Sequence, residues 1–227
     1  MIRIAEKQDI PAILAIYGPY ILTSTATFEY DIPTEEAFLQ RFETITTQFP
    51  WLVWEENGEI LGYAYASPPY SRAAYQWCAE PSVYLHPDAR GKGIGKALYA
   101  ALESILKIQG YQILYALITG ENDASLHFHK KCGYKQMVRF SDCGFKFGRW
   151  LDLIWMEKRL KPVEIPSSPP DSWNHLRNNA QKFSDILAIL SLSERRKICY
   201  VMHGGNCAFF GLPRMKFVAN HILYKEL

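Results

Sequence analysis

The spacing of hydrophobic residues divides the first 160 positions into segments of two kinds. Some have apolar residues every third or fourth position, as an amphipathic helix does, and others have alternating or continuous apolar residues, as strands do. The order along the chain is a short strand and a helix (2–21), a helix (35–45), strands (51–56, 59–68, 79–87), a helix (94–110), a strand (111–119), a helix (122–134) and two strands (134–142, 147–160). This alternation predicts a mixed α/β layer fold.

Local signals support several of these boundaries. Asp9 with Pro11, and Thr34, stand where helix N-caps are expected. Asn57-Gly58 lies between two strand patterns and predicts a tight hairpin. Gly110 and Gly133 follow helical patterns and are expected to end them.

The composition changes after residue 160. Residues 161–172 are rich in proline and serine, which is typical of a linker. Residues 173–227 contain one plausible amphipathic helix, at 183–197. We therefore expect a first domain at 1–160, a linker at 161–172 and a partly helical extension of open role at 173–227.

Composition and charge exclude some classes of protein. The chain has 227 residues and a net charge of +2, which is too small to indicate a nucleic-acid or anionic-membrane partner. No apolar run approaches the roughly 18 residues of a membrane span, and the N-terminus lacks the apolar core of a signal peptide. The five cysteines are scattered without a C-x-x-C pair. This pattern favours reduced thiols in a cytoplasmic protein over disulfides or a zinc site.

The glycine-rich stretch from Arg90 to Gly95 lies between a strand pattern and a helix pattern. Such a turn can direct backbone N–H groups and a helix N-terminus at a phosphate, or it can be a tight turn without a ligand. Ala97 stands where a P-loop needs Ser or Thr for magnesium. The G-x-G-x-G spacing and the late position in the chain do not fit the dinucleotide fingerprint of a first βα turn.

Two motifs resemble the GCN5-related N-acetyltransferase (GNAT) superfamily. Arg90-x-x-Gly93-x-Gly95 is similar to its pyrophosphate loop, and the segment from Asn122 to Gly133-Tyr134 is similar to a later family motif. The phosphinothricin and methionine sulfone acetyltransferase-like branch is suggested by five further stretches: STATFE (24–29), RAAYQW (72–77), Glu80-x-Ser82-Val-Tyr84, HPDARGKGIG (86–95) and FGRWLD (147–152). Together these motifs cover roughly residues 2–160.

The resemblance implies a fold and an activity. The GNAT fold has a twisted, mostly antiparallel sheet with helices on both faces, and its two central parallel strands splay apart. The implied activity is acetyl transfer from acetyl-CoA to the α-amino group of a small amino-acid-like acceptor, such as phosphinothricin, methionine sulfoximine or methionine sulfone. Transfer is expected to be direct, in a ternary complex, because the sequence shows no base beside Cys78 or Cys132.

The resemblance also implies roles for individual residues. Glu80 is the expected general base, acting through water, although Pro81 removes a ladder donor and suggests that the strand begins only at Ser82. His129 is expected to act as the acid near the sulfur or to contact the coenzyme, and it could equally be a partly exposed helix histidine. Asn122 is expected to bind the coenzyme or to cap its helix. The expected coenzyme-binding residues are Val83, Tyr84 and Leu85 through their backbone, Arg90, Gly91, Lys92, Gly93, Ile94, Gly95, Lys96, Asn122 and Ser125.

The acceptor pocket is assigned by the branch resemblance to Phe28, Glu29, Arg72 and Tyr75. Arg72 could clamp a substrate carboxylate by two hydrogen bonds. Each of these residues could instead belong to ordinary loop packing or to the interface of a homodimer, which the resemblance also implies.

Three alternatives remain open. The same fold could acetylate a polyamine or a protein N-terminus, or the domain could sense acetyl-CoA without turnover. We expect no metal ion: His127 and His129 face apart on a helix, so they are poorly placed to share a metal with Cys132. Cys199, His203 and Cys207 are interrupted by two glycines and are interpreted as structural.

Overall fold

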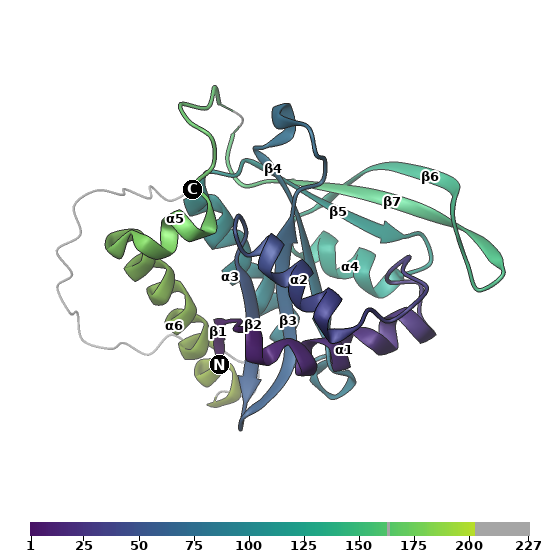
Figure 1. Ribbon diagram of the computed structural model, residues 1–227, viewed down its shortest axis with the longest axis horizontal. Helices are drawn as coiled ribbons and strands as arrows, with labels where there is room; N and C mark the ends of the chain where they lie inside the picture. Colours follow the sequence, from purple (N-terminus) through teal and green to yellow (C-terminus); the bar gives the residue numbers. More distant parts are fainter. Residues whose placement is uncertain (163, 203–227) are drawn as a thin grey trace.

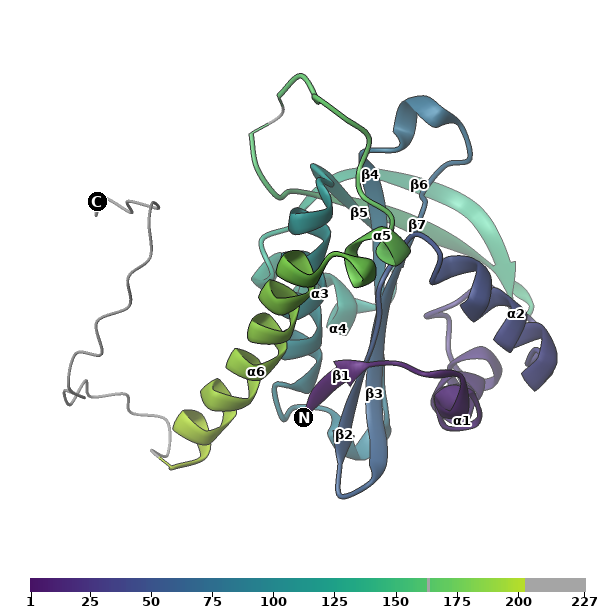
Figure 2. The same ribbon diagram turned by 60° about the vertical axis from the view of Figure 1, so that its left-hand side comes forward.

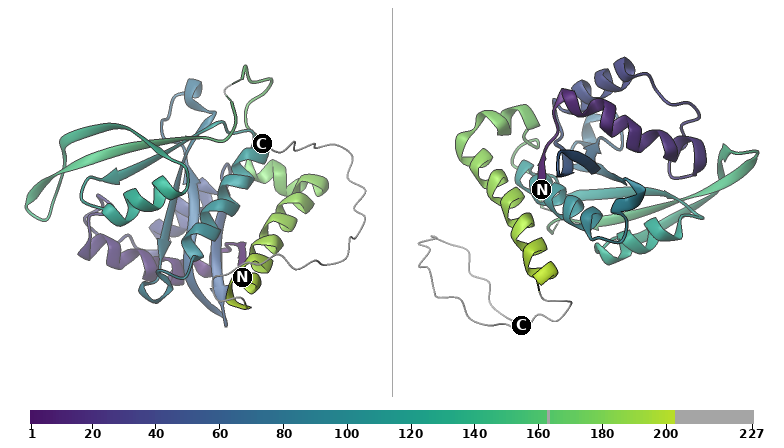
Figure 3. Two further views of the ribbon diagram at one scale, coloured as in Figure 1. Left: turned by 180° about the vertical axis from the view of Figure 1, so that it is seen from behind. Right: turned by 90° about the horizontal axis from the view of Figure 1, so that it is seen from below.

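A seven-stranded sheet in the order β1-β2-β3-β4-β5-β7-β6 forms the centre of the molecule. The computed structural model describes residues 1–162 and 164–202, with side chains as far as residue 191. Helices cover both faces of the sheet, and the hairpin of β6 and β7 projects beyond them (Figures 1 and 3). None of the described helices is long and apolar enough to cross a membrane.

The strands follow the predicted segments closely. They are β1 (Ile2–Ile4), β2 (Trp51–Glu56), β3 (Glu59–Ser67), β4 (Cys78–Leu85), β5 (Ile113–Thr119), β6 (Lys135–Lys146) and β7 (Arg149–Arg159). Neighbours are antiparallel except β4 and β5, which run parallel and separate after two residue pairs. A parallel pair needs a long crossover, and the helix between them supplies it. The predicted fold, including the splay, is confirmed.

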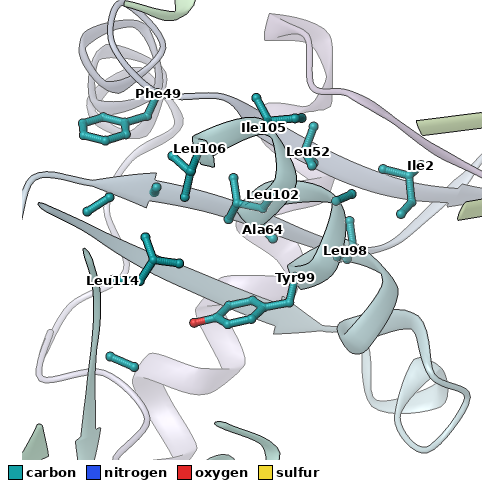
Figure 4. Packing of buried hydrophobic residues seen from close by; sticks show 14 of the residues in the cluster. Ile2, Phe49, Leu52, Ala64, Leu98, Tyr99, Leu102, Ile105, Leu106 and Leu114 are labelled. Atoms are coloured by element: carbon teal, nitrogen blue, oxygen red, sulfur yellow. The ribbon is translucent and has the colours of Figure 1, made fainter. Parts of the chain in front are cut away.

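The helices pack on the sheet as two groups. They are α1 (Ile10–Thr23), α2 (Glu35–Ile45), α3 (Ile94–Gln109), α4 (Asp123–Lys131), α5 (Trp173–Asn178) and α6 (Ala180–Met202). On one face, α3 buries leucine and isoleucine side chains against the strands (Figure 4). On the other face, α1 and α2 bury a second cluster around Trp51 and Tyr63. The sheet therefore separates two cores.

Most predicted boundaries have a visible physical cause. The Thr34 hydroxyl accepts from the Ala37 N–H, 3.2 Å away, and caps α2. Asn57 and Gly58 both have positive φ values, +54° and +82°, as a tight hairpin requires. Asp9 precedes α1 as predicted, but its carboxylate accepts from Arg3 instead of capping the helix. Gly133 adopts φ +91° just after α4.

The C-terminal extension joins the same core as the rest of the chain. Trp173 and Leu176 of α5 and Ile186 of α6 are almost completely buried, and α6 lies along α3 and past β1 (Figure 2). The segment that leads into α5 is held by Gln109, whose side-chain amide donates to the Asp171 carbonyl at 2.8 Å. The periodicity predicted a helix within α6, whereas the six-residue α5 was not predicted.

Candidate active site

The two central strands separate beside Glu80. Strand β4 pairs with β5 only at Cys78 and Ala79, opposite Ile113 and Leu114. On its other edge, β4 stays paired with β3 from Glu80 to Leu85. From Glu80 onward, the edge of β4 that faces β5 therefore has backbone groups without a strand partner.

Pro81 does not shorten the strand, so the expectation that β4 begins at Ser82 is wrong. The Pro81 carbonyl accepts a hydrogen bond from the Tyr99 hydroxyl at 3.0 Å. Within a strand, the nitrogen and the carbonyl of one residue point to the same edge. The Pro81 nitrogen thus faces the gap left by β5, where no ladder hydrogen bond is lost.

The backbone groups of successive strand residues point to opposite edges, and this alternation identifies which groups face the gap. Residues 81, 83 and 85 point their backbone groups toward it, while Tyr84 points its groups toward β3. Both groups of Leu85 are taken by the Tyr20 hydroxyl, which donates to the carbonyl at 2.7 Å and accepts from the N–H at 3.3 Å. Of the three residues expected to bind coenzyme through their backbone, Val83 is therefore the one whose N–H points into the gap and is not taken by Tyr20.

The Glu80 carboxyl is partly buried at the separation of the strands. Within the described residues it has no hydrogen-bond or ion-pair partner, and burial raises its pKa from 4.5 to about 7. Its charge in turn contributes to raising the pKa of Tyr65, Tyr70 and Tyr99, which places those phenols within electrostatic range. A carboxyl with this pKa can exchange a proton at neutral pH.

The glycine loop adopts the conformation that an anion site needs. Gly91 and Gly93 have φ values of +74° and +78°, in the region that favours glycine, and Gly93 caps α3. The first N–H groups of α3 have no partner within the helix and lie at the positive end of its dipole. Lys92 and Lys96 are exposed on this loop, and the Arg90 guanidinium stacks on the Tyr20 ring at 5.3 Å. Loop and helix together fit a pyrophosphate.

Helix α4 holds the predicted polar residues of the second motif. The Asn122 side-chain oxygen accepts from the Ser125 N–H at 3.1 Å, so Asn122 caps the helix. His129 is buried, and its Nε2 lies 2.9 Å from the Tyr99 hydroxyl. Its Nδ1 lies 2.8 Å from the Ser125 carbonyl, and burial lowers the pKa of the imidazole. Both ring nitrogens thus contact protein groups, and the reading of His129 as a partly exposed histidine is wrong.

The four predicted acceptor residues fall into two separate pairs. Phe28 and Glu29 lie in the loop after α1, and Phe28 packs so closely on Gly144 of β6 that a Cβ there would lie 2.5 Å from its ring. Arg72 and Tyr75 lie in the segment before β4, both exposed, with the Tyr75 ring 4.3 Å from that of Tyr70. The structure shows no hydrogen bond or ion pair between the two described pairs.

Three residues near the site were not predicted. Besides Tyr20 and Tyr99, Lys146 on β6 is 2% exposed and donates to the carbonyls of Ser24 (2.9 Å) and Thr27 (2.7 Å). Lys146 therefore ties the loop of Phe28 to the β6–β7 hairpin. No local signal marks these contacts, because each partner is distant in the sequence.

Comparison with known proteins agrees with this geometry. The family model of the GNAT acetyltransferase domain matches residues 2–155. Phosphinothricin N-acetyltransferase of Alcaligenes faecalis is 37% identical over 164 residues, covering 70% of this chain and 82% of that protein. The L-methionine sulfoximine/L-methionine sulfone acetyltransferase of Salmonella typhimurium is 33% identical, covering 74% and 98%.

A solved structure shows the same similarity. The phosphinothricin acetyltransferase of Sinorhizobium meliloti, crystallised with acetyl-CoA, matches with a TM-score of 0.71 and 36% identity, covering 74% of this chain and 94% of that one. This chain belongs to the GNAT acetyltransferase family. It is an N-acetyltransferase, as the resemblance predicted.

Cys199, His203 and Cys207 lie outside the residues whose side chains the structure describes. Within the described residues, no group of three or more His, Cys, Asp or Glu side chains is arranged to hold a metal ion.

Proposed function

We propose that this enzyme transfers the acetyl group of acetyl-CoA to the α-amino group of a small amino-acid-like acceptor. The observation that carries the proposal is the unpaired, partly buried Glu80 carboxyl at the separation of β4 and β5, with a pKa of about 7. The names of relatives such as phosphinothricin N-acetyltransferase support acceptors of the phosphinothricin, methionine sulfoximine or methionine sulfone type.

Acetyl-CoA fits the described site as donor. The loop from Arg90 to Lys96 and the first amides of α3 would hold its pyrophosphate. Asn122 and Ser125 lie at the start of α4 and remain proposed coenzyme contacts. The gap beside Val83 would take the pantetheine arm and the thioester.

The residues divide the reaction between them. Ionised Glu80 would take a proton from the acceptor ammonium group, through water, and so free the nitrogen lone pair for attack on the thioester carbonyl. The Val83 N–H would donate to the carbonyl oxygen as negative charge develops there. The C–N bond forms, the C–S bond breaks, and the second proton that the nitrogen loses neutralises the departing thiolate, which leaves as coenzyme A.

Direct transfer is favoured over an acetyl-cysteine. Burial raises the pKa of the Cys78 and Cys132 thiols, so at neutral pH they are poor nucleophiles. Cys143, the remaining cysteine whose side chain is described, is also free. Free thiols are in keeping with the cytoplasmic location that we propose.

The test is a panel of amines incubated with acetyl-CoA, with thiol release and product mass measured. Methionine sulfone, methionine sulfoximine and phosphinothricin should react, with Arg72→Ala raising their KM and leaving the KM of acetyl-CoA unchanged. Preference for spermidine or for an N-terminal peptide would assign another acceptor. Tight coenzyme binding without turnover on any amine would indicate that the protein senses acetyl-CoA and does not catalyse acetyl transfer.

Substitution of Gly93 should damage coenzyme binding. A valine at φ +78° is strained, because its Cβ and branched side chain oppose the left-handed conformation. We expect Gly93→Val to raise the Kd of acetyl-CoA by about tenfold or more, measured by calorimetry. Gly58→Val is the matched control, with φ +82° and equally open surroundings, in the β2–β3 turn outside the proposed loop. An unchanged Kd in Gly93→Val would contradict the proposed loop.

We further propose a homodimer built on the β6–β7 hairpin. Strand β6 is at the edge of the sheet, and Met137, Phe140, Phe145 and Trp150 are exposed on this hairpin. An exposed edge with apolar side chains favours pairing with a second copy. The double variant Phe140→Asp/Trp150→Asp should halve the mass measured by light scattering. The control Leu22→Asp, exposed on α1, should not change it. A monomeric wild-type protein would refute the dimer.

A further inference from the structure

Where β4 leaves β5, a tyrosine takes over the hydrogen bond that a strand would make. The Tyr99 hydroxyl donates to the Pro81 carbonyl at 3.0 Å, and the Tyr99 side chain is fully buried on α3. Figure 4 shows this side chain projecting from α3 toward the strands. Pro81 lies directly after Glu80 and two residues before Val83, so the contact holds the backbone between the base and the proposed carbonyl donor.

His129 contacts the same hydroxyl from the opposite side. Its Nε2 is 2.9 Å from the Tyr99 oxygen, and the two rings meet nearly at right angles. Its Nδ1 is occupied by Ser125, through the carbonyl at 2.8 Å and the hydroxyl at 3.3 Å. Neither ring nitrogen is left over for the sulfur of a coenzyme.

A count of protons shows how His129 would control Tyr99. The Pro81 carbonyl and the Ser125 carbonyl can only accept, and the Tyr99 hydroxyl has a single proton to donate. Because the Ser125 carbonyl cannot donate, Nδ1 carries the proton of the neutral ring and Nε2 is bare, so Nε2 and the Pro81 carbonyl both accept from the one phenol proton. Only when the ring also gains a proton on Nε2 does it donate to the Tyr99 oxygen, and the phenol proton then goes to Pro81 alone. The titratable groups around this pair are Tyr134, Glu103, Cys132 and Glu80.

We propose that Tyr99 is a positioning residue that holds the Pro81 carbonyl in place of the missing strand, and that His129 acts through Tyr99. This inference rests on the proposed function, because it gives Tyr99 the task of placing Glu80 and the Val83 N–H on either side of the acetyl group. It replaces the predicted role of His129 as an acid at the sulfur.

The variant Tyr99→Phe tests the hydroxyl while keeping the ring. Loss of the Pro81 contact should lower kcat by about tenfold to a hundredfold, as misplacement of catalytic groups does, and leave the KM of acetyl-CoA unchanged. Tyr111→Phe is the control, since Tyr111 is equally buried just after the far end of α3 and its hydroxyl accepts from Gln48 at 2.9 Å. Its kcat should stay within about twofold, although it too loses the hydrogen bond of a buried phenol.

The variant His129→Gln separates positioning from acid catalysis. Its amide N–H₂ can donate to the Tyr99 oxygen and so leave the phenol proton to Pro81, but it does not act as an acid at neutral pH. We expect kcat within about threefold of the wild type. A fall of a hundredfold, or equal kcat values for Tyr99→Phe and Tyr111→Phe, would overturn the proposal.

A measurement that needs no catalytic turnover tests the role of Tyr99 separately from the proposed function. Amide hydrogen exchange at Ser82 and Tyr84, which face β3, should be faster in Tyr99→Phe than in the wild type and unaltered in Tyr111→Phe. Faster exchange in a protein that acetylates no amine would reject the proposed function and retain the role of Tyr99 in holding β4. Unaltered exchange in Tyr99→Phe would reject that role.

Discussion

Replacing Glu80 with glutamine is expected to lower turnover by about 10²–10⁴-fold, the usual contribution of a positioned base. Glutamine keeps the size of the side chain but cannot accept a proton from the acceptor ammonium group. The affinity for acetyl-CoA, measured by calorimetry, should not change, because the glycine loop is untouched. Glu36→Gln, at an exposed position on α2, is the control and should retain full activity.

The same substitution should make the protein more stable at neutral pH. The Glu80 carboxyl titrates near 4.5 when unfolded and near 7 when folded, so ionising it in its partly buried site opposes folding. This cost is absent below about pH 4.5, grows as the pH rises, and is complete above about pH 7. The free energy of unfolding of Glu80→Gln should therefore exceed that of the wild type by about 1–3 kcal/mol at pH 7.5 and by far less at pH 4.5. Equal stability of Glu80→Gln and the wild type at both pH values would contradict the partial burial of an unpaired charge.

Replacing Trp173 with alanine is expected to lower the free energy of unfolding by about 3–5 kcal/mol. Trp173 is 1% exposed and belongs to the same cluster as α3, so its removal leaves a cavity in the main core. Chemical denaturation monitored by circular dichroism measures this effect. A single cooperative transition should persist, since extension and domain share one core.

The control for this prediction is Leu22→Ala. Leu22 is 57% exposed on α1, outside the proposed dimer interface, so the loss of its side chain should cost little stability. If Trp173→Ala were as stable as Leu22→Ala, the extension would contribute nothing to the core.

The fold was predictable where short-range signals determine it. The Asn57-Gly58 turn, the Thr34 cap and the periodicity of α3 need only neighbouring residues, and each element formed as expected. The effect of Pro81 on the start of β4 was predicted wrongly, because a proline costs a ladder hydrogen bond only when its nitrogen faces a paired edge of the strand. That edge is decided by the departure of β5, which no short-range signal shows. Helix α5 was missed because six residues carry too little periodicity.

The candidate site was predictable in its motifs and less so in its contacts. Glu80 and the Arg90–Gly95 loop carry recognisable spacings, and the structure places both at the splay or beside it. The partial burial of Glu80 and the burial of His129 depend on packing between elements that are distant in sequence. Tyr20 and Leu85 are separated by 65 residues, so their hydrogen bonds could not be inferred from a local pattern.

The dependence of kcat/KM on pH tests the central claim that Glu80 is the base of this acetyltransferase. With methionine sulfone as acceptor, kcat/KM of the wild-type protein should rise with pH along a limb with an apparent pKa of about 7 and then reach a plateau. The residual activity of Glu80→Gln should lack this limb. A wild-type profile without an ionisation near pH 7, or the same limb in Glu80→Gln, would contradict the claim.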